Sequence, residues 1–178
     1  MRRAALMAAL LATVGNAARA DVVTADAHGF ELRSSVETTL RPDAAFRRFL
    51  AVAKWWSDDH TYSGQARRLR IDARPGGCWC ESLPGGGGVQ HMTVAYVDAP
   101  RALRFLGGLG PLQELAVQGA MTVTFKQQGS GTRVTLVYRV AGQRAGGFAE
   151  LAPVVDSVLR TQLGRYAAQD TAAGASQR

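Results

Sequence analysis

The segment "AMTVTFKQQGSGTRVTLVYRV" (Ala120–Val140) decides the fold class, because two alternating runs flank a short turn signal. Apolar residues alternate with polar ones throughout both runs, which is the pattern of a strand with one buried face. The apolar positions are Met121, Val123 and Phe125 in the first run, and Val134, Leu136, Tyr138 and Val140 in the second. With "GSGT" as the turn, the segment predicts an antiparallel hairpin with one face exposed to water.

The same pattern continues toward the N-terminus. Four further runs, "RRLRIDA", "CWCESL", "VQHMTVAYV" and "RALRFLG", are separated by glycine- and proline-rich turn signals. An earlier strand is predicted in "FELRSSVETTL" (Phe30–Leu40), and a short helix in "RPDAAFRRFLAVAKWW" (Arg41–Trp56), where proline suits the first turn. A long amphipathic helix is predicted over residues 146–169, where apolar residues recur with a period of 3.6.

These elements indicate the α+β class. One apolar sheet face and one long apolar helix bury each other in a helix-grip fold, a curved antiparallel sheet of about seven strands wrapped around the C-terminal helix. The short helix follows the first strand. A single helix does not fill a wide curved sheet, so we expect a cavity between the two that takes small apolar ligands.

The first twenty residues have the pattern of a cleavable signal peptide: paired arginines, an apolar run and "ARA" before Asp21. We therefore expect residues 1–20 to be a signal peptide, 21–29 an N-terminal extension, 30–169 the folded domain and 170–178 a disordered tail. The predicted location is periplasmic or secreted, with no stable membrane insertion after cleavage.

The charge of the chain adds little about partners. The formal net charge of +7 falls to +4 without Arg2, Arg3 and Arg19, which lie in the predicted signal peptide. The arginine cluster in "ARRLRIDAR" (residues 66–74) fits the outer face of a strand. No nucleic-acid-binding motif is present, so we expect no nucleic-acid partner. The oligomeric state is left open.

The motifs "WWSDDHTYSG", "PGGCWCE", "HMTVAYVDAP", "LRFLGGLGPLQ" and "LAPVVDSVLRTQLGRY" resemble bacterial proteins of the SRPBCC or START-like superfamily. The subgroup that they resemble is the homologue of the activator of the heat shock protein 90 ATPase. The resemblance covers roughly residues 30–168. It implies the helix-grip fold, and it leaves activity open, since the superfamily includes lipid carriers and polyketide cyclases.

Both cysteines of the chain lie in "CWCESL". Residues i and i+2 of a regular strand lie at the limit of disulfide geometry, so a bond would need a bulge. We expect Cys78 and Cys80 to be buried free thiols that face the helix. A zinc site needs three or four converging ligands, of which Cys78 and Cys80 could supply two and His60 or His91 a third. Strand alternation points His91 away from the cysteines, and the sequence has no Cys-x-x-Cys and no His-x-x-x-His, so we expect no metal. The glycine run after Pro84 lacks the features of a phosphate loop, and no cofactor is predicted.

The hairpin partner "VQHMTVAYV" decides where Glu81 and His91 point. If Met92, Val94 and Tyr96 face the helix, then Trp79, Glu81 and His91 share the outer face with Thr93. On that face Glu81 and His91 would form a solvated ion pair. A slip of one residue in the strand pairing would exchange these assignments.

Three functions follow, and we favour the first, a binding module rather than an enzyme. It would hold a small hydrophobic or amphipathic molecule between sheet and helix, with "GGLGPLQ" (Gly107–Gln113) as a second lip. The predicted ligand-binding residues are Trp56, His60, Tyr62, Cys78, Cys80, Met92, Tyr96, Phe105, Met121, Phe125 and Tyr138. The alternative is a cofactor-independent cyclase or dehydratase that transfers protons through His60, Glu81 or His91. A third function is a protein-interaction module that uses the outer arginines.

Overall fold

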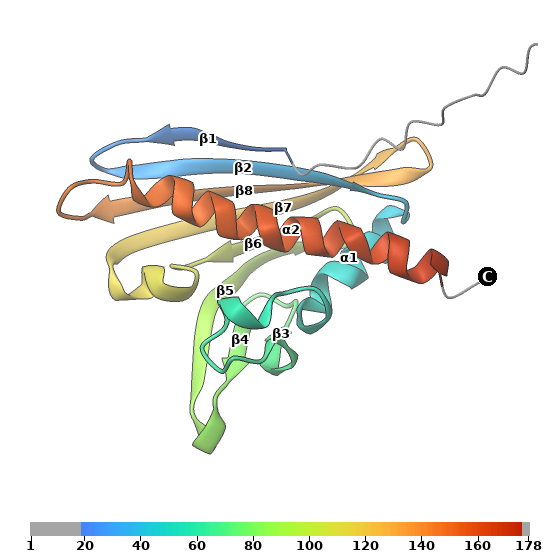
Figure 1. Ribbon diagram of the computed structural model, residues 1–178, viewed down its shortest axis with the longest axis horizontal. Coiled ribbons are helices and arrows are strands. Elements are labelled where there is room, and N and C mark those ends of the chain that lie inside the picture. The colour runs from blue at the N-terminus through green and yellow to red at the C-terminus, as the bar shows by residue number, and fades with distance from the viewer. Residues whose placement is uncertain (1–18, 176–178) are drawn as a thin grey trace, which may run out of the picture.

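The computed structural model describes residues 19–175, and for residues 19–21 and 171–175 it describes the backbone only. One antiparallel sheet of eight strands curves around one face of a long helix (Figure 1). The order of the strands across the sheet is β1-β2-β8-β7-β6-β5-β4-β3. The predicted α+β helix-grip fold is therefore confirmed.

The strands are β1 (Arg19–Ala25), β2 (Gly29–Thr38), β3 (Leu69–Ile71), β4 (Cys78–Ser82), β5 (Gly88–Asp98), β6 (Ala102–Leu106), β7 (Ala116–Gln128) and β8 (Gly131–Gln143). The α-helices are α1 (Pro42–Leu50) and α2 (Leu151–Ala175). Short 3-10 turns are η1 (Val52–Lys54), η2 (Asp58–His60), η3 (Ala66–Arg68), η4 (Pro84–Gly86) and η5 (Gly110–Glu114).

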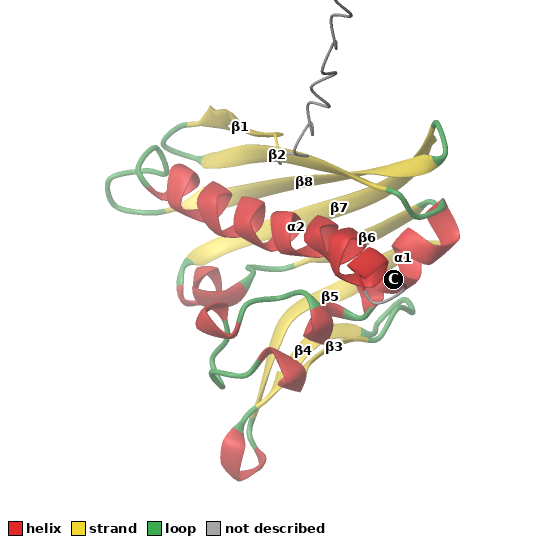
Figure 2. Ribbon diagram, turned by 45° about the vertical axis from the view of Figure 1, so that its right-hand side comes forward, coloured by secondary structure: helices red, strands yellow, loops and turns green. Residues whose placement is uncertain are grey.

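The hairpin of β7 and β8 forms the centre of the sheet, as its alternating sequence predicts. Val123 pairs with Leu136 and Phe125 with Val134, and all four side chains are buried. Toward the edge formed by β3 the sheet bends, so that β5, β4 and β3 curl away from the plane of β7 and β8 (Figure 2). The bend creates the space in which η2 and η5 lie.

Helix α1 is shorter than the apolar pattern before Trp56 suggests. It ends at Leu50, and the chain continues through η1 to Trp55, whose indole N–H donates to the carbonyl oxygens of Arg48 and Phe49 at 3.1 and 3.2 Å. The last carbonyls of a helix have no partner within the helix, so this side chain satisfies them. The ring of Trp55 also lies 5.7 Å from that of Tyr166 in α2, which joins the two helices over the core.

Two predicted boundaries need correction. The predicted extension over residues 21–29 instead contributes to β1, which pairs with β2 and makes an eighth strand. The predicted disordered tail from Asp170 is wrong at its start, because α2 continues to Ala175. The Asp170 carboxylate accepts hydrogen bonds from the Thr39 N–H at 2.8 Å and the Thr38 hydroxyl at 3.0 Å. The predicted signal peptide lies outside the described residues, apart from Arg19 and Ala20.

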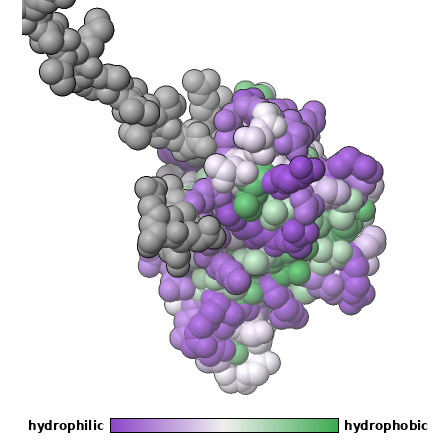
Figure 3. Space-filling model, turned by 90° about the vertical axis from the view of Figure 1, so that its right-hand side faces the viewer, coloured by the Kyte–Doolittle hydropathy of each residue, from purple (hydrophilic) through white to green (hydrophobic). Residues whose placement is uncertain are grey.

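The face of the molecule shown in Figure 3 is mainly hydrophilic, with hydrophobic residues visible in a band across it. Among residues 19–175, no helix has the length and apolar character needed to cross a membrane.

Candidate functional site

A cavity of about 570 Å³ lies between α2, η5 and the loop that contains η2. Its apolar lining comes from Trp56, Leu69, Trp79, Leu109, Pro111, Leu112, Leu115, Leu151, Val154, Val155, Val158 and Leu159. Its polar lining comes from Asp59, His60, Thr61, Tyr62, His91, Glu114 and Arg144. Apolar walls with a few polar groups are typical of sites for small molecules.

A β-bulge places His91 in the wall of this cavity. Trp79 pairs with Met92 and the next residue, Cys80, pairs with Gln90, so His91 is the extra residue of β5. A bulge changes the direction of the side chains around it. Consequently the consecutive residues His91 and Met92 are both buried, whereas one of the two would be exposed in a regular strand.

His91 forms a buried pair with Glu81. Its Nε2 lies 3.0 Å from Glu81 Oε2, and the two residues are 5% and 1% exposed. The Glu81 carboxylate also accepts hydrogen bonds from the backbone N–H groups of Tyr62 and Ser63. These bonds join the loop after η2 to β4, so the same carboxylate orients the imidazole and holds the cavity mouth.

Electrostatics keep this pair as a carboxylate and a neutral imidazole. Burial alone would raise the pKa of the Glu81 carboxyl, but hydrogen bonds from Ser63, Tyr62 and His91 outweigh burial and lower that pKa. Burial lowers the pKa of His91, and the neighbouring Glu81 offsets only part of this effect. A carboxylate is an acceptor only, so Nε2 of His91 carries the proton.

A second histidine, His60, is oriented by α2. Ser57 donates its backbone N–H to Gln162 Oε1 at 2.8 Å, which leaves the Gln162 amide nitrogen as the donor to His60 Nδ1, also at 2.8 Å. His60 therefore accepts at Nδ1 and carries its proton at Nε2. The two cavity histidines thus both have the Nε2–H tautomer, each fixed by a buried neighbour.

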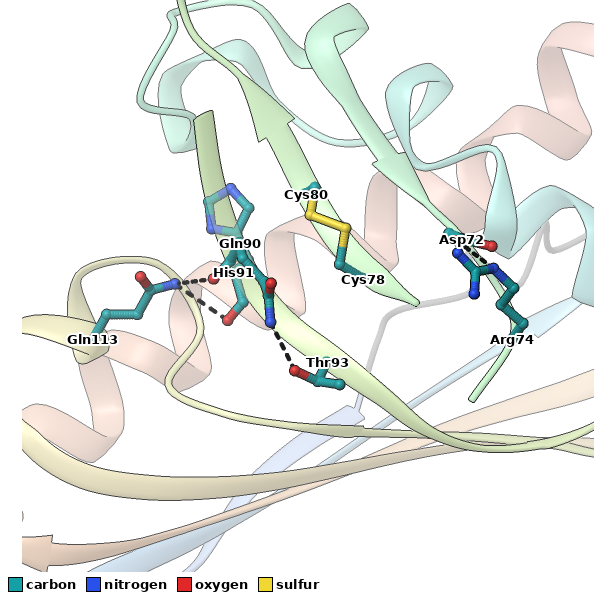
Figure 4. Close-up of a disulfide and its surroundings, with 8 residues drawn as sticks. All are labelled: Asp72, Arg74, Cys78, Cys80, Gln90, His91, Thr93 and Gln113. Carbon is teal, nitrogen blue, oxygen red and sulfur yellow. Dashed lines mark hydrogen bonds and ion pairs between the residues drawn. A yellow bond between two sulfur atoms is a disulfide. The ribbon is translucent and has the colours of Figure 1, made fainter. Parts of the chain in front are cut away.

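Residues 109–115, which contain η5 and are called the η5 lip below, are hydrogen-bonded to the sheet at both ends. At its start, the Tyr138 hydroxyl accepts from the Leu109 N–H at 2.9 Å and donates to the Gly107 carbonyl at 3.0 Å. Near its end, Gln113 Nε2 donates to the carbonyl oxygens of Gln90 and His91 at 2.8 and 3.2 Å, across the bulge (Figure 4). The lip and the His91 bulge therefore form one connected structure.

The cysteines do not reach the cavity. Cys78 and Cys80 form a disulfide, with 5.4 Å between their Cα atoms (Figure 4). The prediction of free thiols is wrong, because the Cα atoms of Cys78 and Cys80 lie closer than in a regular strand and within the range that a disulfide spans. The predicted facing is also wrong: Trp79 and Glu81 point inward, so alternation places the two cysteines on the other face of β4.

Apart from Cys78 and Cys80, the predicted ligand-binding residues divide into three sets. Trp56, His60 and Tyr62 lie in the cavity lining. The side chains of Met92, Phe105, Met121, Phe125 and Tyr138 pack in the core and are not part of the lining. Tyr96 is 45% exposed, because a second irregularity, between Val94 and Tyr96, turns it outward. Of the alternative catalytic residues, His60 and His91 line the cavity and Glu81 lies behind His91.

The sequence prediction placed the cavity against the C-terminal helix but named none of the residues of α2 that line it. Val155 and Val158 form one wall, and Gln162 supports His60 from the same helix. The sequence did carry a signal for these residues. Val154, Val155 and Val158 widen the apolar stripe of the helix beside the buried core residues Ala152 and Leu159. Within residues 19–175 no group of three potential metal ligands converges.

The fold and the cavity define a helix-grip domain of the SRPBCC type. The family described as "Activator of Hsp90 ATPase homolog 1-like protein" matches residues 44–166, which is most of the chain. The protein belongs to that family. The predicted superfamily and subgroup are thus confirmed. No curated protein shows significant similarity to the sequence.

Solved structures share the fold at low sequence identity. Protein Ms6760 from Mycobacterium smegmatis is 18% identical, with a TM-score of 0.52 over 89% of this chain and 97% of that chain. Protein CV1439 from Chromobacterium violaceum is 17% identical, with a TM-score of 0.55 over 78% and 95%. The conserved protein EF2215 from Enterococcus faecalis is 12% identical, with a TM-score of 0.57 over 85% and 75%. At these identities the likeness concerns the fold alone.

Proposed function

We propose that this domain binds a small hydrophobic or amphipathic molecule in the cavity between the sheet and α2. The observation that carries the proposal is the cavity itself, about 570 Å³ in volume and walled mainly by aliphatic and aromatic side chains. Ligand sites in proteins span about 300–1,000 Å³, and apolar walls supply most of the binding free energy.

Filling the cavity tests this proposal. Val158 lines the cavity from α2, and Val158→Trp places an indole in the ligand volume. Arg160, on the same helix, is exposed, so Arg160→Trp is the matched control with the same new side chain. With Nile red as a neutral apolar probe, we expect Val158→Trp to weaken binding at least about tenfold. Absence of Nile red binding to the native domain, or equal affinities for the two variants, would contradict the proposal.

Export belongs to the same proposal. The pattern of residues 1–20 supports delivery to the periplasm or the medium, where a domain with an apolar cavity would carry or capture its ligand outside the cytosol. The Cys78–Cys80 disulfide supports this location, because disulfides persist in oxidising compartments.

A proton-transfer enzyme is the second candidate. The observation that favours it is the inward position of the Glu81–His91 pair, since a carboxylate-oriented imidazole in a cavity wall is the arrangement of a general base. The test is deuterium exchange at the carbon next to the carbonyl of tetralone, a ketone small enough for the cavity. Faster exchange with the native protein than with His91→Gln supports a proton-transfer function. Equal exchange rates for the two proteins contradict it.

A further inference from the structure

The second ring nitrogen of His91 has no partner among the described residues. Nδ1 is buried and makes no hydrogen bond there, although the residue is only 5% exposed and lines the cavity. Buried polar atoms in proteins are nearly always satisfied, so an orphaned one at a cavity wall calls for a missing partner. Apolar packing alone leaves this atom unexplained.

The neighbours of His91 decide whether Nδ1 donates or accepts a hydrogen bond. Glu81 Oε2 receives the Nε2–H of His91, so Nδ1 holds a lone pair and accepts a hydrogen bond. The neighbouring N–H groups of Tyr62 and Ser63 do not supply this donor, because both already donate to Glu81. The donor to Nδ1 therefore comes from outside the described residues, from a ligand group or a water molecule.

The charges around the cavity disfavour an anionic ligand group here. The Glu81 carboxylate lies directly behind His91, and the carboxylates of Asp59 and Glu114 are part of the lining. The ring of Tyr62, 5.9 Å from that of His91, has its pKa raised by burial and by Glu114 and Glu81, which keeps the phenol neutral. The single cation of the lining, Arg144, donates to the Gly147 carbonyl.

We propose that His91 selects ligands that carry a neutral hydrogen-bond donor, such as a phenol or an alcohol, and that this group binds Nδ1 while the apolar part fills the cavity. This inference rests on the proposed binding function and adds the chemical class of the ligand. A methyl ether of the same skeleton keeps the apolar contacts and leaves Nδ1 without a partner. A carboxylate on that skeleton brings a second negative charge toward Glu81.

Three probes of one skeleton test the inference: naphthol, its methyl ether and naphthoate, titrated into the native domain by calorimetry. We expect naphthol to bind about five- to tenfold more tightly than the ether, and naphthoate to bind most weakly. In His91→Phe, which keeps an aromatic ring, the preference for naphthol over the ether should disappear while the ether still binds.

A second measurement does not depend on a variant that folds. In native protein labelled with ¹⁵N, naphthol should shift the Nδ1 resonance of His91, and the methyl ether should leave it in place. Equal affinities of naphthol and ether, a preference that survives in His91→Phe, or an unmoved Nδ1 resonance with naphthol bound would each overturn the inference alone. Failure of all three probes and of Nile red to bind would overturn the proposed function as well.

Discussion

At the scale of single residues, His91 makes stability depend on pH. Its pKa in the folded protein lies below the ordinary value of 6.5, so below pH 6.5 the unfolded chain binds more protons than the folded one. The free energy of unfolding should therefore fall as the pH drops through this range, by at most about 1.4 kcal/mol per pH unit. Urea unfolding between about pH 7.5 and about pH 5.5 measures this slope.

The control for this slope is His91→Gln, whose amide donates to Glu81 and does not titrate. Glu81 itself affects a lower range, because its carboxyl has a pKa below the ordinary 4.5 in the folded state and its contribution is lost only as the pH falls through that lower value. The variant should thus show a flatter profile above about pH 5.5. A slope as steep as that of the native protein would show that another group is responsible.

At the scale of elements, a very short disulfide loop lies within β4, next to the bulge of β5. The entropy that a disulfide removes from the unfolded chain grows with loop length, and Cys78 and Cys80 are only two positions apart. We expect the double variant Cys78→Ser, Cys80→Ser to lose no more than about 1.5 kcal/mol of unfolding free energy in urea. Nile red affinity should change little, because both sulfur atoms lie away from the cavity. A loss of about 4 kcal/mol would contradict the loop-length argument.

The η5 lip depends on Gln113. Replacing it by leucine removes both hydrogen bonds to the bulge at a similar side-chain size, so the lip should open more often. Amide hydrogen exchange over residues 109–115 should rise about five- to tenfold, the equivalent of about one hydrogen bond. Gln118→Leu, an identical change at an exposed position of β7, is the control. Unchanged exchange in the lip of Gln113→Leu would show that the Tyr138 anchor is sufficient.

The same elements show what the sequence could predict. Alternation marks each strand because burial of one face is a local pattern, as in β7 and β8, and the helical period marks α2 in the same way. The face on which Glu81 and His91 lie could not be predicted, because it depends on a one-residue bulge at His91 that no local propensity encodes. The disulfide between Cys78 and Cys80 was missed because their Cα atoms lie 5.4 Å apart, closer than the regular strand spacing that the sequence pattern predicts. His60 and Tyr62 were found because polar and aromatic residues gather in a loop where the fold places a cavity mouth.

At the scale of the whole molecule, the proposed export must be compatible with the N-terminal strand. Cleavage after Ala20 removes Arg19 and Ala20 from β1 but keeps the pairs of Asp21 with Arg33 and of Val22 with Leu32. It also keeps Thr24 with Glu31 and Ala25 with Phe30. The edge of the sheet therefore stays covered, and a chain beginning at Asp21 should unfold at the same temperature as one beginning at Arg19.

The decisive measurement is the intact mass of the protein recovered from the periplasm of a bacterial host. We expect a mature chain that begins at Asp21, and a chain beginning at Asp26, made as a comparison, should be less stable because β2 becomes an exposed edge strand. Ala20→Glu removes the small residue that the peptidase needs and should leave the precursor uncleaved. A mature terminus beyond Ala25 would contradict the prediction, because β1 and the edge that it covers would then be absent from the working protein.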